Sequence, residues 1–330
     1  MVMAFGVPDD RMVRLAAVSP DGTPQLGLPG SLALLPYLSR ETQSRLQKVL
    51  VTPDGPLPWP TQSRAVVNCI TDADVCAQAL SRLGDVVKSA GLPCFNHPHA
   101  VAESTREKIA ARLATVPAVR MPRTVRITLD DPCRLAAVVE EAGMQFPVIV
   151  RTTGSHGGTT TRKIDTPADA AVALAKIPWG GRPLYVTEYV EYGSPDGLHR
   201  KMRVVVVGQE IFLRHLVASR GWHVHAEDRE GGIHAEEEDA LARFPVELLP
   251  RLGSPVKRIA HVLELDYFGI DCSLLADGTL LVFEANAAMN VLLNPAPSPN
   301  CWDTPVRQIR DAVEALLSAP ERWIHRGNHP

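Results

Sequence analysis

Residues 269 to 286 contain two carboxylates and an amide at a spacing that could hold a metal ion. The segment reads Gly269-Ile-Asp-Cys-Ser-Leu-Leu-Ala-Asp-Gly-Thr-Leu-Leu-Val-Phe-Glu-Ala-Asn286, and its Asp277-Gly278 pair predicts a two-residue hairpin turn. Counting from that turn places Asp271 directly opposite Glu284, with Asn286 on the same face. Oxygen ligands of this kind suit a hard cation such as Mg²⁺ rather than zinc.

The same register sorts the hydrophobic residues of this hairpin. One face is expected to be apolar, and its residues are Ile270, Cys272, Leu274, Leu281, Phe283 and Ala285. Leu280 and Val282 are expected beside the carboxylates, so that face is not plainly exposed to solvent. We therefore favour a metal site over the alternative, which is two solvated carboxylates on an open sheet face.

A second hairpin, residues 201 to 214, carries positive charge. Gly208-Gln209 is a plausible type II′ turn, and counting from it places Arg203 opposite Arg214. Two facing guanidinium groups are unfavourable unless an anion bridges them, and a polyphosphate would supply that anion. The alternative of two surface arginines with solvated ends stays open for this hairpin taken alone.

A glycine-rich loop, Arg151-Thr-Thr-Gly-Ser-His-Gly-Gly158, follows an apolar segment. Successive backbone N–H groups in such a loop can surround phosphate oxygens. The loop is neither a Walker A sequence nor a dinucleotide fingerprint, because no Gly-Lys-Ser/Thr follows it and no GxGxxG occurs in the chain. It continues into Thr159–Lys163 rather than a helix, so we expect a mobile β-hairpin flap.

Length and composition limit the classes of protein that could carry these groups. A chain of 330 residues with 45% hydrophobic and 22% charged residues predicts about two globular domains and excludes a disordered or fibrous protein. With 37 acidic and 34 basic residues, the chain lacks the basic excess of a nucleic-acid binder. Its six cysteines form no CxxC pair, and no apolar run could span a bilayer, so we expect reduced thiols, no membrane partner and a cytoplasmic location.

The elements that must position these residues alternate between strands and helices. Short buried strands are expected at 14–18 and 64–70, and a helix at 74–90 that Gly91 ends, which together suggest a small α/β domain. Further expected helices lie at 100–114, 132–142, 167–176, 245–263 and 304–317, and further strands at 121–127, 146–151 and 184–190. Because antiparallel hairpins concentrate after residue 184, the pattern predicts an α+β fold.

Taken in order, these pieces resemble the ATP-grasp superfamily over roughly residues 94 to 295. The Gly-Ile-Asp motif ending at Asp271, followed by Glu284-Ala-Asn286, carries most of the resemblance, and Glu188-Tyr-Val-Glu191 adds to it. Within the superfamily the chain looks closest to ligases of the ribosomal-S6-modifying and glutathione-synthase type, including stand-alone members found in biosynthetic clusters. The resemblance implies a small α/β domain at 1–100, a grasp lobe with the flap at 101–184, and a C-terminal lobe with the metal site at 185–330.

The resemblance also implies roles for single residues. The ATP-binding residues would be Lys108, Arg151, Ser155, His156, Gly157, Gly158, Glu188, Tyr189, Val190, Glu191 and Lys201, of which Glu188 to Val190 contact adenine and Glu191 the ribose. Asp271, Glu284 and Asn286 would hold two Mg²⁺ ions, with Mn²⁺ as the alternative metal. Arg214 and Arg203 would stabilise the transferring phosphoryl group.

The implied activity is an ATP- and magnesium-dependent ligase that joins a carboxylate to an amine through an acyl phosphate and releases ADP and phosphate. The alternatives are a small-molecule kinase with the same fold and a non-catalytic nucleotide-binding module. The partners would be small-molecule or peptide substrates, and a homodimer stays open. Weaker expectations name His215, His225, Asn290, His97 and Arg229 as substrate contacts, 221–239 as a lid, and Glu236–Asp239 as a solvated charge run.

Overall fold

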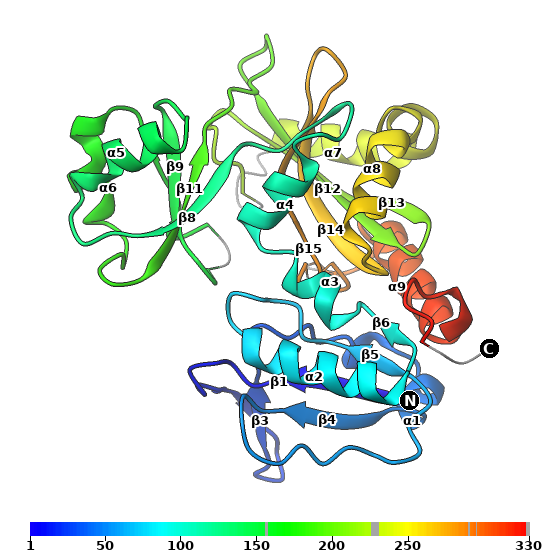
Figure 1. The fold of residues 1–330 in the computed structure, drawn as a ribbon. Helices are drawn as coiled ribbons and strands as arrows, with labels where there is room; N and C mark the ends of the chain where they lie inside the picture. Colours follow the sequence, from blue (N-terminus) through cyan, green and yellow to red (C-terminus); the bar gives the residue numbers. More distant parts are fainter. Residues whose placement is uncertain (156–157, 226–230, 290, 295, 328–330) are drawn as a thin grey trace.

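Three larger β-sheets, one two-stranded sheet and the helices packed on them make up the described part of the chain, which is residues 1–155, 158–225, 231–289, 291–294 and 296–327 of the computed structural model (Figure 1). The predicted α+β class is confirmed, because of the three larger sheets one is parallel, one is antiparallel and one is mixed. None of the helices in the described ranges has both the length and the hydropathy to span a bilayer.

The N-terminal sheet is parallel. Its strands, in spatial order, are β4 (Gln47–Val51), β1 (Val2–Gly6), β5 (Val66–Asn68) and β6 (Cys94–Phe95). The helix α2 (Ala77–Ala90) packs on it and ends at Gly91, which has a φ of +61° as the predicted C-terminal glycine requires. Sequence reasoning missed β1, the strand that lies second in this sheet.

The predicted buried strand at 14–18 exists but is exposed. It is β2 (Arg14–Val18), which pairs only with β3 (Pro24–Gly27), and all five of its residues are exposed. Its run of four apolar residues resembles that of a core strand, but the strand pairs only within this two-stranded hairpin and does not join the parallel sheet. The expectation of burial was therefore wrong.

The middle sheet is antiparallel. Its strands, in spatial order, are β10 (Arg162–Ile164), β9 (Val148–Thr152), β11 (Pro183–Glu188) and β8 (Thr124–Thr128). The helices α5 (Arg134–Glu141) and α6 (Ala170–Leu174) pack against it and share a separate hydrophobic core with it. This unit lies to one side of the other two sheets (Figure 1).

The third sheet is the largest and carries the two hairpins. Its strands, in spatial order, are β13 (Glu210–Ser219), β12 (His199–Val207), β14 (Tyr267–Leu274), β15 (Leu280–Asn286) and β7 (Val119–Arg120). Val204 and Val206 enter a core that includes α8 (Leu249–Leu263), and Val205 and Val207 enter one that includes α9 (Asp303–Leu317). Burial on both faces explains the unbroken valine run in β12.

The remaining helices connect these sheets. They are α1 (Arg40–Ser44), α3 (Pro98–Ala102), α4 (Arg106–Leu113) and α7 (Gly231–Arg243), and a π-helical turn (Phe244–Leu248) joins α7 to α8. The single helix predicted at 100–114 is thus two helices. The predicted domain boundaries stay predictions. Three elements are not confined to the lobe predicted at 101–184. β7 belongs to the third sheet, α4 packs against α8, and β11 crosses the predicted boundary at residue 184.

Candidate active site

Asp271 and Glu284 face each other across β14 and β15, as the sequence predicted. The turn is one residue longer than predicted, because Leu274 pairs with Leu280 and not with Leu281. A bulge between these pairs and the acidic pair then shifts the register back by one residue. The two irregularities cancel, so Asp271 and Glu284 pair as predicted. The residues between this pair and the turn are paired one position away from their predicted partners.

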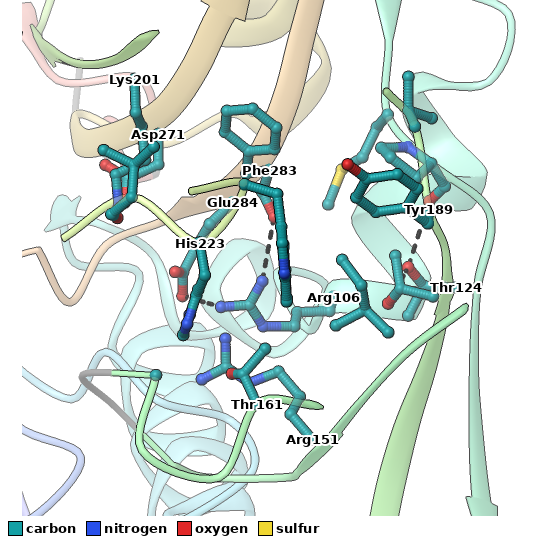
Figure 2. Close-up of a pocket in the computed structure, with 18 of the residues that line it drawn as sticks. Arg106, Thr124, Arg151, Thr161, Tyr189, Lys201, His223, Asp271, Phe283 and Glu284 are labelled. Carbon is teal, nitrogen blue, oxygen red and sulfur yellow. Dashed lines mark hydrogen bonds and ion pairs between the residues drawn. The ribbon is translucent and has the colours of Figure 1, made fainter. Parts of the chain in front are cut away.

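The bulge changes which side chains face the cavity. Leu280 and Val282 share a core with Ile270, so they do not lie beside the carboxylates as predicted. Phe283 was expected on the apolar face, but it is the extra residue of the bulge and lines the cavity instead (Figure 2).

The predicted pairing of Arg203 with Arg214 was wrong. The turn is where it was expected, because Val207 pairs with Glu210 around Gly208-Gln209, but Arg214 is an extra residue that lets Arg203 pair with His215. Arg214 is buried and donates hydrogen bonds to main-chain carbonyls of the segment after β15, at 3.0 Å and 2.9 Å. It therefore anchors that segment and does not line the cavity.

Arg203 is instead paired with the acid of the neighbouring hairpin. Its Nε and Nη2 lie 2.7 Å and 2.8 Å from the two carboxylate oxygens of Asp271, and Lys201 Nζ lies 3.8 Å from the same carboxylate. Burial acts to raise the pKa of Asp271, but the charge and hydrogen bonds of Arg203 outweigh it, so the pKa is lowered. Asp271 is therefore ionised at neutral pH.

A cavity of about 470 Å³ lies between the middle and third sheets, and both acids line it. Its acidic and basic residues come from six elements and are Arg106, Arg151, Glu188, Lys201, Arg203, Asp271 and Glu284. Figure 2 shows Tyr189 and Thr124 on the side away from Lys201 and Asp271. The cavity thus has one strongly charged side and one side built from a backbone segment and aromatic or apolar groups.

Two guanidinium groups approach Glu284 (Figure 2). Arg106 Nη2 lies 2.5 Å from Glu284 Oε1, and Nη1 donates to the carbonyl of Phe283 at 3.1 Å. Burial lowers the pKa of Arg151 to about 10, and the charge of Arg106 adds to that shift. Arg151 Nε is buried and has no hydrogen-bond partner among the described residues. Because Arg151 lies near the positive charge of Arg106 and its Nε–H has no partner among the described residues, it is suited to bind an anionic ligand.

The donor set at β14 and β15 fits a magnesium ion. Burial acts to raise the pKa of Glu284, but Arg106 and Arg151 lower it, so this second carboxylate is also ionised. Asn286 donates a hydrogen bond to Glu284 at 2.8 Å. No cluster of three or more His, Cys, Asp or Glu side chains gathers as a metal site in the described ranges. The set matches Mg²⁺, which proteins usually hold through one or two carboxylates together with substrate phosphates.

The segment after β11 forms the less charged wall. Glu188, Tyr189 and Val190 all line the cavity, whereas Glu191 does not. The carboxylate of Glu191 accepts hydrogen bonds from its own loop, and chiefly the backbone N–H of Gly193 lowers its pKa to about 2. Among the described residues, no backbone carbonyl accepts a hydrogen bond from the N–H of Val190. A nucleotide base could accept a hydrogen bond from the N–H of Val190, whereas the carboxylate of Glu191 already accepts hydrogen bonds from its own loop.

Lys108 lies outside the cavity. Its Nζ is 2.9 Å from both Glu103 Oε1 and the carbonyl of Ala102. Arg106 lines the cavity in its place. Residues two apart on a helix project in nearly opposite directions, so α4 can present only one of the two there. Sequence reasoning missed Arg106, although the helix start at Thr105 would have fixed which residue faces inward.

The flap residues fall in different places. Gly158 lines the main cavity, and a Cβ added there would lie 2.6 Å from His225 Cε1, so only glycine fits this contact. Ser155 lines a second, smaller cavity. The remaining predicted site residues, His156, Gly157, Arg229 and Asn290, lie outside the described residues, as do 226–230 of the expected lid.

The histidines predicted as substrate contacts also separate. His225 lines the cavity together with His223, with ring centroids 4.1 Å apart, whereas His215 and His97 do not. His97 packs against His325 instead, at 4.5 Å between centroids. Trp222, next to this pair, also lines the cavity and was not assigned a role from the sequence.

The predicted solvated charge run at 236–239 lies in α7 and is only partly exposed. Glu237 is 1% exposed and accepts a hydrogen bond from Trp302 Nε1 at 3.0 Å. Glu236 pairs with Arg200 on β12. The run therefore ties α7 to the third sheet and α9, so the expectation of a solvated run was wrong for these two residues.

No family model and no curated protein sequence matches this chain. Solved structures do resemble it. The RimK domain protein ATP-grasp from Sphaerobacter thermophilus is 13% identical, with a TM-score of 0.52 over 96% of this chain and 98% of that one. The D-alanine–D-alanine ligase from Coxiella burnetii is 10% identical, with a TM-score of 0.54 over 97% and 96%.

The D-alanine–D-alanine ligase from Bacillus anthracis, solved in complex with ATP, is also 10% identical, with a TM-score of 0.52 over 97% of this chain and 96% of that one. At such identities the likeness establishes the fold. The chain has the ATP-grasp fold over nearly its whole length, as the sequence resemblance implied.

Proposed function

We propose that this ATP-grasp chain is an ATP- and magnesium-dependent ligase that joins a carboxylate to an amine through an acyl phosphate and releases ADP and phosphate. The observation that carries the proposal is the charged side of the cavity, where two ionised carboxylates lie among four cationic side chains. Solved structures of similar fold include ligases, one of them in complex with ATP, which supports the proposal.

Bound ATP would lie along the cavity, with adenine against Glu188 to Val190 and the phosphates toward the charged side. Arg106, Arg151 and Lys201 would neutralise the phosphate oxygens. Magnesium held by Asp271, Glu284 and Asn286 would draw charge from the phosphates when bound. Phosphoryl transfer needs chiefly positioning and charge neutralisation, and these side chains would provide both.

The reaction would proceed in two steps. A carboxylate oxygen of the substrate attacks the γ-phosphorus, the bond from phosphorus to the β–γ bridging oxygen breaks, and ADP leaves with that electron pair. The amine then attacks the acyl carbon and loses a proton, and the carbon–oxygen bond to phosphate breaks. Gly158 of the flap contacts the His223–His225 pair over the cavity, and this contact would keep water from the acyl phosphate.

The six cysteines fit the proposed cellular setting. All six are free thiols, and four of them are buried. Reduced thiols are typical of a reducing compartment, so a cytoplasmic ligase is part of the proposal.

Trapping with hydroxylamine tests this function. The full chain is incubated with ATP, Mg²⁺, hydroxylamine and a set of carboxylic acids, and the expected products are ADP and a hydroxamate. Chelation with EDTA should stop the reaction, and Mg²⁺ or Mn²⁺ should restore it. Formation of AMP and pyrophosphate would exclude the acyl-phosphate mechanism. ADP release that never depends on an amine would favour the kinase.

A further inference from the structure

Among the described residues, hydrophobic cores join the N-terminal sheet to the third sheet but not to the middle sheet. Ala4 of β1 lies in one core with Val204 of β12, and Met3 lies in another core with Val205. The middle sheet has a core of its own and lies to one side of the other two sheets (Figure 1). Its position relative to them therefore depends on contacts outside these cores.

One face of the middle sheet carries a row of three polar side chains. Leu184 and Val186 of β11 enter the core of this sheet, so Tyr185 between them projects from the opposite face. Tyr185 pairs in register with Arg126 of β8 on one side and with Arg151 of β9 on the other. Cross-strand partners project from the same face of a sheet, so Tyr185 lies between two arginines.

Two acids from the rest of the chain meet this row. Asp74, in the loop between β5 and α2, accepts a hydrogen bond from Tyr185 Oη at 2.7 Å and is paired with Arg126. Glu107 of α4 is paired with the same guanidinium group, with its Oε1 3.0 Å from Nε of Arg126. The side chains of Asp74 and Glu107 are only 11% and 23% exposed, so solvent screens these pairs less than surface pairs. We call Asp74, Glu107, Arg126 and Tyr185 the clasp.

The loop that carries Asp74 also contacts the start of the flap. A Cβ added to Gly154 would lie 3.0 Å from Cγ2 of Val75, and the φ of Gly154 is +63°, which favours glycine. The loop therefore meets the middle sheet both at the row and at the flap that follows Arg151.

The clasp lies near two cations that belong to different parts of the chain. Arg106 comes from α4 and Arg151 from the middle sheet, and both approach Glu284 (Figure 2). Burial and then the charge of Arg106 lower the pKa of Arg151 to about 10. Glu284, Tyr185 and Asp74 act in the opposite direction. Bound phosphate would balance both guanidinium groups, but before it binds their repulsion favours moving the middle sheet away from α4.

We propose that the clasp holds Arg151 next to Arg106, in position for the phosphates of ATP, before ATP binds, and that Asp74 is its main positioning residue. The inference rests on the proposed function. Asp74 attracts the row of the middle sheet and so opposes the repulsion between the two arginines. A polyphosphate that bridges both arginines would replace this support. Weakening the clasp should therefore lower the fraction of free protein that is ready to bind ATP, and raise KM for ATP more than it lowers kcat.

The test measures nucleotide binding and turnover of the full chain with Asp74→Asn. Calorimetry follows binding of a non-hydrolysable ATP analogue with an imido β–γ bridge, in the presence of Mg²⁺, and ADP release follows turnover with hydroxylamine and the acid found by trapping. We expect Kd for the analogue and KM for ATP to rise by about tenfold, with kcat within about threefold of the wild type. Asp85→Asn, at an exposed position of α2, is the matched control and should bind the analogue as the wild type does.

A double-mutant cycle separates positioning from a merely structural role. Arg151→Met removes the cation that the clasp positions and weakens binding by itself. In that background Asp74→Asn should raise Kd by about twofold at most, because no repulsion with Arg106 remains for the clasp to oppose. A contact that only supports the fold would cost the same factor in both backgrounds. If Asp74→Asn does not fold, Tyr185→Phe takes its place in the cycle, with an expected rise in Kd of about threefold.

The two proposals fail in different ways. An unchanged Kd in the folded clasp variant, or a rise by the same factor with and without Arg151, would overturn the clasp while the ligase function stands. Binding of the analogue without ADP formation from ATP, with every acid and amine, would overturn the ligase function, and the binding measurements would still decide the role of Asp74.

Discussion

The hairpins β12–β13 and β14–β15 belong to one sheet, yet counting from the turn places the charged residues correctly in only one of them. In β14–β15 a longer turn and a bulge cancel, so Asp271 faces Glu284. In β12–β13 the turn is as predicted and the bulge at Arg214 has no compensating shift, so Arg203 faces His215. Register counted from a turn holds only up to the first bulge, and in both hairpins a bulge adjoins the charged residues.

The same comparison explains how like charges coexist in this sheet. Arg203 on β12 is the cross-strand partner of Asp271 on β14, and Arg106 from α4 pairs with Glu284 on β15. Each carboxylate of the acidic pair therefore has its own guanidinium group. The β14–β15 hairpin supplies two acids to the cavity. The two arginines of β12–β13 have different positions: Arg203 lines the cavity, and Arg214 donates hydrogen bonds to carbonyls of the segment after β15.

Removing the acid that both hairpins share should have the largest effect. Asp271→Asn takes away a carboxylate that would hold magnesium and leaves Arg203 without its anionic partner. We expect ADP-forming turnover to fall by about 10³-fold, because the charge at the phosphates is no longer balanced. Steady-state kinetics with the acid found by hydroxylamine trapping measure the change.

The matched control for this substitution is Asp277→Asn in the turn of the same hairpin. Asp277 is exposed, and its Oδ1 accepts the N–H of Thr279, which asparagine can also do. Its turnover should stay within about twofold of the wild type. If Asp271→Asn also stays within about tenfold, the assignment of β14 to the metal is wrong.

The two arginines of β12–β13 should separate into different effects of intermediate size. Arg203→Gln should lower turnover by about 10- to 100-fold, because Arg203 lines the cavity and orients Asp271. Arg214→Gln should lower the free energy of unfolding by about 2–4 kcal/mol, because a buried guanidinium loses hydrogen bonds to two carbonyls. Kinetics and urea unfolding of both variants measure the two effects.

The opposite pattern would restore the role that the sequence suggested for Arg214. If Arg214→Gln lowers turnover as much as Arg203→Gln and leaves the unfolding free energy unchanged, then Arg214 acts on the phosphoryl group and not on the fold. Arg251→Gln, at an exposed position of α8, is a control for loss of positive charge alone.

Local chemistry made much of the fold predictable. Gly91 ends α2, Gly208-Gln209 forms its turn, and the α+β class follows from the pattern of elements. The signals that failed depended on distant parts of the chain. β2 has the apolar run of a buried strand but joins none of the larger sheets, and Glu237 is buried where Trp302, 65 residues later, donates a hydrogen bond to it.

The site was predictable as a set of strands and loops but not as a set of contacts. The carboxylates, the flap and the segment 188–190 line the cavities or adjoin them because each lies on a recognisable element. Arg106 was missed because which residues of α4 face the cavity depends on where the helix begins, and the role of Lys108 stays a prediction. The small cavity was not foreseen, since its walls come from segments up to about 200 residues apart.

The smallest expected effect is a difference in pH dependence between the hairpins. The pKa of Asp271 lies below its ordinary value of 3.8, because Arg203 outweighs burial. A lowered folded-state pKa means that the ionised group stabilises the fold above that ordinary value, and that this stabilisation is lost as the pH falls below it. Asp271→Asn should therefore cost about 1–3 kcal/mol at pH 6 and less at pH 3.

The cost of Arg214→Gln should change less between the two pH values, because the two carbonyls that accept hydrogen bonds from its guanidinium group do not titrate. Urea unfolding of wild type and both variants at pH 6 and pH 3 measures the two differences. Equal costs of Asp271→Asn at both pH values would mean that Arg203 does not hold the carboxylate ionised. A cost of Arg214→Gln that shrinks with acid would mean that Arg214, too, is balanced by an acid, and the contrast between the two hairpins would then disappear.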